Sequence, residues 1–175
     1  VITGGAGKIG SAIANKFINE NIEVILLDKN FKNLDLNIKK KCVCIVCDLT
    51  NNSQINKALN TILKLFGGID SLIANSGAAF QGSMLNVKKD ILEKSLEVNF
   101  YSHHNIVQKI ANIMVSQGFG GSISLNLSKQ SINPGKDFGP YGIAKASSLF
   151  SMKQYALEFG KYNIRVNGIN ADRIK

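Results

Sequence analysis

The amino-acid sequence predicts an α/β fold: a doubly wound parallel sheet with helices on both faces, three layers in a single domain. The first observation is that short apolar runs alternate with longer amphipathic segments along the whole chain, which is the pattern of βαβ units. The second is that 175 residues, 45% of them hydrophobic and 19% charged, suffice for one domain with a sizeable core. Right-handed crossovers between parallel strands then place helices on both faces.

The predicted elements follow in a regular order. Residues 1–3 end a strand, and further strands are predicted at 22–28, 42–50, 69–77, 121–128 and 164–170. Helices are predicted at 9–21, 52–67, 88–118 and 141–161, with Asn51 or Asn52 as a candidate N-cap and Gly67 as a stop for the second. Because the chain begins inside a strand and ends just after one, we expect residues 1–175 to be truncated at both ends, without a C-terminal strand and the substrate lobe.

The formal net charge of +9 raises the question of a nucleic-acid partner. The lysines are scattered, however, and arginine, whose planar fork suits phosphate and guanine, occurs only at Arg165 and Arg173. No apolar run reaches the length of a membrane span, and the first residues do not form a signal peptide. The composition argues against nucleic-acid and membrane partners and leaves a small-molecule substrate.

The three cysteines, Cys42, Cys44 and Cys47, lie together in "CVCIVC". Such a cluster could bind a metal ion, but no nearby histidine or second cysteine pair completes a zinc site. The run also has the pattern of a short apolar strand, in which cysteine behaves as a small buried side chain. We predict structural cysteines, no metal, and, from reduced thiols without a signal peptide, a cytoplasmic protein.

The stretch "VITGGAGKIGSAIA" runs from a strand through a glycine loop into a helix, with Gly4, Gly7 and Gly10 spaced three apart. Glycines in this context permit a tight turn and let the backbone approach a pyrophosphate at the helix N-terminus, which predicts a Rossmann-type dinucleotide site. The "GK" pair also suggests a P-loop, but that motif needs serine or threonine after the lysine, and here Ile9 follows Lys8.

Asp28 ends the next predicted strand, eighteen residues beyond Gly10. A carboxylate at this place can accept hydrogen bonds from the adenosine ribose hydroxyls, and it would repel the 2′-phosphate of NADP. The positive charge of Lys8 could instead favour the extra phosphate of NADP. The glycine loop can, however, place Lys8 against the pyrophosphate that both cofactors share. We expect the side chain of Lys29, next to Asp28, to point away from the position of that 2′-phosphate. The sequence therefore predicts NAD as the cofactor, with NADP less favoured.

The stretch "FGPYGIAKAS" sets Tyr141 and Lys145 four residues apart at the start of a predicted helix, on one face. Lowering the pKa of a phenol from about 10 to about 7 takes about 4 kcal/mol. One ammonium at about 4 Å, with an effective dielectric constant of about 20, supplies about that amount. The pair suits general acid/base chemistry; the alternative interpretation is an amphipathic helix that begins with a tyrosine.

Taken together, "TGGAGKIG", "ANSGA" after the fourth strand and "YGIAK" resemble the short-chain dehydrogenase/reductase family. Asn99 in "LEVNF", Ser128 in "LNLSK" and the strand "IRVNGIN" extend the likeness over essentially all 175 residues. The resemblance implies hydride transfer between NAD(H) and an alcohol or carbonyl substrate. The stretches "NPGKDFGPYGIAKA" and "RVNGINADRI" further resemble the dehydrogenase half of bifunctional aldolase/short-chain dehydrogenases, which act on sugar-derived substrates.

The resemblance also assigns catalytic roles. Tyr141 would be the general acid/base, and Lys145 would lower the pKa of Tyr141 and bind the nicotinamide ribose. Asn99 would hold a water in the proton relay, with a helix kink or backbone hydrogen bonding as its alternative role. Ser128 would hydrogen-bond the substrate oxygen. The implied catalytic residues are Asn99, Ser128, Tyr141 and Lys145.

The cofactor-binding assignments follow in the same way. Asp48 would contact the adenine edge together with the backbone of Leu49, and Asn75 and Gly77 would line the adenosine ribose. The implied cofactor-binding residues are Gly4, Gly7, Lys8, Ile9, Gly10, Asp28, Asp48, Leu49, Asn75, Gly77, Tyr141 and Lys145.

Three features depart from the family pattern. Counting back thirteen residues from Tyr141 places the catalytic serine at Ser128, whereas counting forward from Asn126 places it at Lys129, and Ser131 is a third candidate. Lys8 stands where many members have glycine. "NADR" replaces the usual Pro-Gly after the last strand.

His103 and His104, in "FYSHHNIV", point in different directions on a helix, and we interpret them as surface or subunit-contact residues. By analogy with the family, which commonly pairs the helices around residues 90–117 and 141–160 across subunits, we expect a homo-oligomer, a dimer or a tetramer.

Two alternatives to an NAD(P)-dependent oxidoreductase stay open. The motif "TGGAG-x-IG" also occurs in nucleotide-sugar epimerases and dehydratases of the extended branch of the family, which need a longer C-terminal substrate domain. The chain could also be a nucleotide-binding module without turnover.

Overall fold

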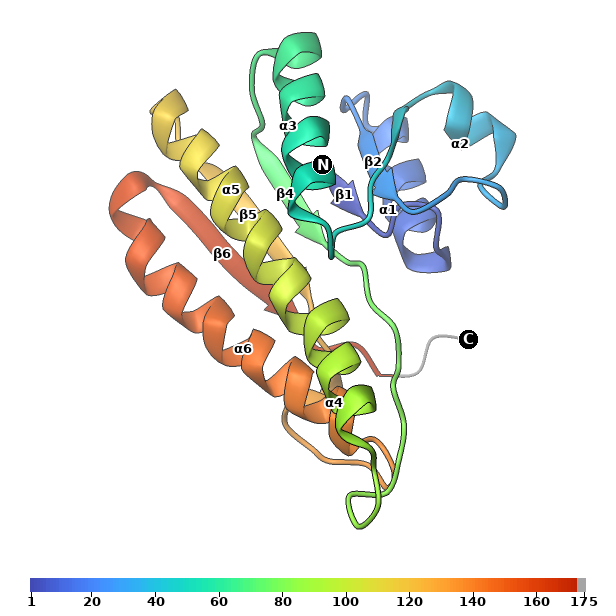
Figure 1. The fold of residues 1–175 in the computed structure, drawn as a ribbon. Helices are drawn as coiled ribbons and strands as arrows, with labels where there is room; N and C mark the ends of the chain where they lie inside the picture. Colours follow the sequence, from blue (N-terminus) through green and yellow to red (C-terminus); the bar gives the residue numbers. More distant parts are fainter. Residues whose placement is uncertain (173–175) are drawn as a thin grey trace.

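The computed structural model describes residues 1–172 and contains a six-stranded parallel sheet, which confirms the predicted α/β fold (Figure 1). The strand order is β3-β2-β1-β4-β5-β6, so the sheet grows outward in opposite directions from β1 and β4. In such sheets the ligand crevice lies where the order reverses, at the carboxyl ends of the strands. The strands are β1 (Ile2–Thr3), β2 (Ile25–Asp28), β3 (Val43–Val46), β4 (Ser71–Ala74), β5 (Gly121–Asn126) and β6 (Ile164–Ile169).

Helices connect the strands and pack on both faces of the sheet. Side chains of α3, α5 and α6 build one core and those of α1 and α2 build the other, and Figure 1 shows α5 and α6 running side by side. The helices are α1 (Lys8–Asn19), α2 (Leu36–Lys40), α3 (Asn52–Phe66), α4 (Lys89–Leu96), α5 (Ser102–Gln117) and α6 (Gly139–Phe159), with short 3-10 turns at Lys129–Ser131 and Gly160–Tyr162.

The side chains of β2 show why this strand is a continuous apolar run in the sequence. Ile25 and Leu27 belong to the core beneath α3, α5 and α6, whereas Leu26 belongs to the core beneath α1 and α2. Leu26 and Leu27 are neighbours in sequence, and both have 0% exposure. A strand buried on both faces is expected where helices cover both sides of a parallel sheet.

The long helix predicted at 88–118 is present but is interrupted by a π-helical turn, Glu97–Tyr101, between α4 and α5. The side-chain amide of Asn99 donates to the carbonyl oxygen of Ser95 at 3.1 Å, and the Ser102 hydroxyl donates to that of Val98 at 2.7 Å. These bonds compete with the helix for backbone carbonyls one turn earlier. Single π-helical turns are frequent at functional sites.

The cysteines take part in packing. Cys47 is buried in one core, and Cys42 and Cys44 are half-buried against the other. Burial raises the pKa of the Cys47 thiol to about 11. Among the described residues, no group of three or more metal-ligating side chains gathers at one place. Within residues 1–172 no helix is both long enough and apolar enough to cross a membrane.

Candidate active site and nucleotide-binding cleft

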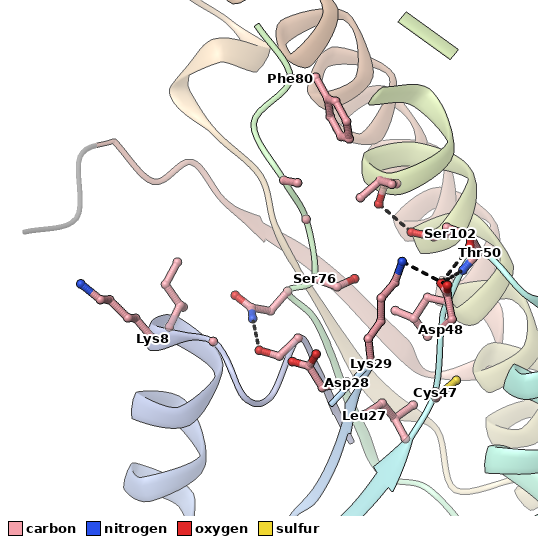
Figure 2. A pocket seen from close by; sticks show the side chains of 18 residues that line it. Lys8, Leu27, Asp28, Lys29, Cys47, Asp48, Thr50, Ser76, Phe80 and Ser102 are labelled. Carbon is pink, nitrogen blue, oxygen red and sulfur yellow. Dashed lines mark hydrogen bonds and ion pairs between the residues drawn. The ribbon is translucent and has the colours of Figure 1, made fainter. Parts of the chain in front are cut away.

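A cleft of about 680 Å³ opens at the carboxyl ends of the strands on either side of the point where the strand order reverses (Figure 2). The residues that line it come from the glycine loop after β1, the ends of β2 and β3, the loop after β4, and the π-helical turn with the start of α5. Of the twelve predicted cofactor-binding residues, Gly10, Tyr141 and Lys145 do not line this cleft, and nine do: Gly4, Gly7, Lys8, Ile9, Asp28, Asp48, Leu49, Asn75 and Gly77.

The glycine loop forms a tight turn against the start of α1. Gly4 has a φ of +62°, which favours glycine, and its carbonyl oxygen accepts from the Gly7 amide at 3.2 Å. A Cβ on Gly10 would overlap that same carbonyl oxygen, so Gly10 is needed for the close approach of loop and helix. Gly7 is the N-cap of α1. The backbone amides of the first helical turn have no partner within the helix, so they can donate hydrogen bonds to an anion.

Asp28 lies at the end of β2, half-buried beside the glycine loop. One carboxylate oxygen accepts from the Ala6 amide at 2.9 Å, which fixes the side chain under the loop. Figure 2 shows the Lys8 side chain extending away from Asp28 and from the other labelled residues of the lining. The arrangement separates a negative charge at the end of β2 from a positive charge at the start of α1.

Lys29 and Asp48 form an ion pair in the lining of the cleft, at 3.0 Å (Figure 2). The expectation that Lys29 simply points away is therefore wrong, because its ammonium is drawn to the carboxylate at the end of the neighbouring strand. Burial acts to raise the pKa of Asp48, but hydrogen bonds from Thr50 and the Lys29 charge outweigh it and lower that pKa. The Asp48 carboxylate already accepts from the Thr50 amide at 3.0 Å and its hydroxyl at 2.8 Å.

The loop after β4 connects the cleft with the predicted catalytic residues. The backbone amide of Asn75 donates to the Thr3 hydroxyl at 2.9 Å, next to the glycine loop. At the other end of the loop, a Cβ on Gly77 would lie 2.8 Å from Asn99 Oδ1 and 3.7 Å from Lys145 Nζ. The cleft therefore reaches the catalytic candidates at Gly77.

Lys145 lies one turn beyond Tyr141 on α6, and it is buried at 3% exposure. Its ammonium donates to the carbonyl oxygen of Asn126 at 2.8 Å and lies 5.8 Å from the centre of the Tyr141 ring. Burial lowers the pKa of Lys145 to about 8.

The expected lowering of the Tyr141 pKa by Lys145 is not seen in this geometry. Burial raises the pKa of Tyr141, and a hydrogen bond with Ser128 acts in the opposite direction. The physical reason is the direction of the Lys145 ammonium, which is bonded to the Asn126 carbonyl oxygen.

Of the three candidates for the serine position, the structure places Ser128 beside the Tyr141 phenol, with which it shares a hydrogen bond. Ser131 instead donates its hydroxyl to the Ser128 carbonyl oxygen at 2.6 Å. Lys129 forms an ion pair with Asp172 at 2.9 Å. The count back from Tyr141 thus selects the hydroxyl that contacts the phenol.

Asn99 is fully buried, and its side chain fastens the loop after β4. Its Oδ1 accepts from the Ala78 amide at 3.1 Å, and its Nδ2 donates to the Ala78 carbonyl oxygen at 2.9 Å. Its own carbonyl oxygen accepts from the Ser148 hydroxyl at 2.8 Å. Asn99 therefore has the alternative role, backbone bonding at a helix irregularity; its role in holding a water stays a prediction.

The interpretation of His103 as a surface or subunit-contact residue is wrong, because the residue is buried within the chain itself. The residue is 2% exposed, and its Nε2 lies 2.5 Å from the carbonyl oxygen of Ser76 in the cleft lining. Burial, together with the nearby Lys145 charge, lowers the pKa of His103 to about 3. His104 is half-buried, with its Nδ1 at 2.6 Å from the Tyr155 hydroxyl.

The buried His103 makes stability depend on pH. Between its ordinary pKa of 6.5 and the folded value of about 3, the unfolded chain binds a proton that the folded protein excludes. The free energy of unfolding therefore falls as the pH falls through this window, by up to about 1.4 kcal/mol per pH unit from this residue. Urea unfolding of wild type and His103→Leu should show a smaller decline in the variant; parallel declines would contradict the assignment.

Several residues of the cleft do not follow from sequence reasoning. Ser76 and Ala78 stand between or beside predicted residues in "ANSGA", and Lys29, Cys47 and Thr50 adjoin Asp28 or Asp48, so sequence proximity could have found them. Val98 likewise adjoins the predicted Asn99, whereas Phe80 and Ser102 carry no such signal, because only tertiary packing brings them to the cleft.

Comparisons with known proteins agree with this architecture. Residues 1–175 match the family model described as short chain dehydrogenase. The chain is 29% identical over 174 residues to dehydrogenase/reductase SDR family member 4 of Bos taurus, covering 95% of this chain and 62% of that protein. It is 28% identical to the uncharacterized oxidoreductase YuxG of Bacillus subtilis, of which it covers 26%.

Among solved structures, NAD+-bound xylitol dehydrogenase superposes with a TM-score of 0.93 at 25% identity, covering 98% of this chain and 68% of that one. The chain thus spans less than two thirds of the cattle relative and about two thirds of this enzyme. Its fold, its cleft and the match along its full length show that the chain belongs to the short chain dehydrogenase family.

Proposed function

We propose that the protein containing this chain is an NAD(H)-dependent oxidoreductase that interconverts an alcohol and a carbonyl compound. The observation that carries the proposal is the position of Gly77, which lines the cleft and approaches both Asn99 and Lys145. A dinucleotide held by the glycine loop and Asp28 would reach the catalytic candidates at this point. Family membership supports the reaction class.

The residues of the cleft fit a dinucleotide. Gly4 and Gly10 let the loop pack closely on its neighbours, Gly7 borders the cleft at the N-terminus of α1, where a phosphate group would bind, and Asp28 offers an acceptor for ribose hydroxyls at the end of β2. When bound, the nicotinamide ring supplies the site that takes or gives the hydride. NAD+ in the structurally similar xylitol dehydrogenase supports this choice of cofactor.

The chain's own residues would handle the proton and the substrate oxygen. In oxidation, the Tyr141 oxygen accepts the proton of the substrate hydroxyl, and in reduction it returns the proton to the forming alcohol. Ser128, already bonded to Tyr141, would orient the substrate oxygen. A bound nucleotide ribose would give the Lys145 ammonium a partner near the phenol, in addition to the Asn126 carbonyl oxygen.

A serine comparison tests this arrangement. Ser128→Ala is expected to lower turnover by about 10²–10³-fold, as removal of an oxyanion-type donor does. Ser131→Ala should change turnover little, since its hydroxyl is bonded to the Ser128 carbonyl oxygen and to Asn170. Steady-state rates of the full-length variants decide between them, and the reverse pattern would move the assignment to Ser131.

Cofactor choice depends on Asp28. We expect the full-length protein to prefer NAD over NADP by about 10²-fold, because the carboxylate would lose its hydroxyl partners and face a 2′-phosphate. The Lys29 ammonium is paired with Asp48 and is therefore a weak attractor for that phosphate. Asp28→Ala should reduce the preference by weakening NAD binding and by relieving the repulsion of NADP. Dissociation constants for both cofactors measure it; tighter NADP binding by wild type would make Lys8 the discriminating residue.

Substrate class and assembly complete the proposal. The resemblance to sugar-active dehydrogenases and the likeness to a xylitol dehydrogenase support a small sugar-derived alcohol or aldehyde. Exposed apolar side chains on α6, Phe150 at 70% and Leu157 at 77%, support a homo-oligomer. Three free cysteines support a cytoplasmic location.

A further inference from the structure

His103 is a buried imidazole beside the cleft that the proposed chemistry does not use. It stands in the first turn of α5, and its Nε2 approaches the carbonyl oxygen of Ser76 at 2.5 Å and the Ser76 hydroxyl at 3.4 Å. Because a carbonyl oxygen can only accept, Nε2 carries the hydrogen and Nδ1 is the bare acceptor.

The other ring nitrogen shows that this position is unusual. Among buried side-chain nitrogen and oxygen atoms of residues 1–172, His103 Nδ1 is the one without a hydrogen-bond partner. Buried polar atoms in folded proteins are nearly always paired, so an unpaired one calls for an explanation. The hydrogen bond from Nε2 to Ser76 is the contact that explains why an imidazole is kept there.

Ser76 is the middle of a loop that is fastened on both sides. On the β1 side, the Thr3 hydroxyl accepts from the amides of Asn75 at 2.9 Å and Ser76 at 3.1 Å. On the α4–α5 side, Asn99 binds the amide of Ala78 at 3.1 Å and its carbonyl oxygen at 2.9 Å. Between these two sets of hydrogen bonds, His103 donates a hydrogen bond from Nε2 to the Ser76 carbonyl oxygen.

The Ser76 peptide touches both halves of the site. A Cβ on Gly4 would lie 2.8 Å from Ser76 Cα, so the glycine loop packs directly on this residue. The next residue, Gly77, packs against Asn99 and Lys145. A shift of the Ser76 peptide would therefore move the glycine loop and the Lys145 environment relative to one another.

A neutral donor is the right chemistry at this place. Burial disfavours a charged imidazole, and the nearby Lys145 ammonium disfavours it further, so the pKa of His103 is lowered to about 3. A lysine or arginine in its place would bring a second cation to the buried Lys145. Imidazole donates one hydrogen bond without adding charge.

We propose that His103 is a positioning residue that holds the Ser76 peptide and so keeps the cofactor-binding loop in register with Lys145 and Tyr141. The inference rests on the proposed function, since it concerns affinity for the dinucleotide. It adds a residue that touches neither cofactor nor substrate and acts through a backbone carbonyl.

The test compares three substitutions in the full-length protein. His103→Gln keeps a donor at about the reach of Nε2, and His103→Leu removes it. His104→Leu is the matched control, because the neighbouring histidine bonds Tyr155 and not the loop. We expect NADH to bind about tenfold more weakly to His103→Leu, and within about threefold of wild type to the other two. NADH fluorescence titration, carried out below each variant's melting temperature, measures these constants.

The outcomes separate the inference from the proposed function. Wild type without NADH binding would remove the proposed function itself. If wild type binds NADH and His103→Leu binds it with equal affinity, only the proposed role of His103 is overturned. The same holds if His103→Gln binds NADH as weakly as His103→Leu does. If His103→Leu does not fold, His103→Asn, whose shorter amide cannot reach Ser76, takes its place with the same expected tenfold loss.

Discussion

Tyr141→Phe in the full-length protein is expected to lower turnover by about 10³-fold or more while NADH affinity stays within a few fold. The substitution removes only the phenol oxygen, which is the proposed proton donor and acceptor. The ring remains and keeps its edge contact with Phe138, whose centroid lies 6.3 Å away. Steady-state NADH oxidation over a panel of sugar-derived aldehydes measures turnover, and fluorescence titration measures affinity.

Lys145→Met is the companion variant. It should damage turnover and NADH affinity together, because the ammonium is proposed to serve both phenol and ribose and because the Asn126 carbonyl oxygen loses its donor. Near-normal turnover in Tyr141→Phe would sink the acid/base assignment, whatever Lys145→Met shows.

Gly10→Ala is expected to abolish NADH binding at any accessible concentration and to lower stability by about 3 kcal/mol. The new methyl group would overlap the Gly4 carbonyl oxygen and press on the Gly5 Cα, and backbone atoms cannot move aside as a flexible side chain can. Opening the loop to relieve the overlap would displace the amides that are proposed to hold the pyrophosphate. Thermal unfolding and NADH titration measure the two effects.

Gly160→Ala is the matched control, since a Cβ there meets nothing within 4 Å and its φ is −55°. It should leave NADH affinity unchanged and raise stability slightly, by about 0.5 kcal/mol. Wild-type NADH affinity in Gly10→Ala would contradict the loop assignment.

Local patterns predicted most of the fold and the principal site. The alternation of apolar runs and amphipathic segments predicted the parallel sheet, because central strands such as β2 are buried on both faces. The spacing of Gly4, Gly7 and Gly10 predicted the tight approach of loop and α1. In contrast, the pattern does not predict α2, which has five residues, too few to show a helical period, and is held by Asp35 capping the amides of Asn37 and Ile38.

The parts that the sequence did not predict depend on tertiary contacts. The burial of His103 follows from the loop after β4, which places the Ser76 carbonyl oxygen against α5. The direction of Lys145 follows from the end of β5, whose Asn126 carbonyl oxygen competes with the phenol for the ammonium. The position of Lys29 follows from the neighbouring β3, which brings Asp48 within 3.0 Å. A helical or strand period contains no information about such partners.

The central claim is that the cleft binds a nicotinamide dinucleotide next to Tyr141 and Lys145. Titration of the full-length protein with NADH and NADPH, followed by cofactor fluorescence, tests it most directly because the substrate need not be known. We predict saturable NADH binding, weaker NADPH binding, and loss of the signal in Gly10→Ala but not in Gly160→Ala. Absence of saturable NADH binding by the folded wild-type protein would contradict the account.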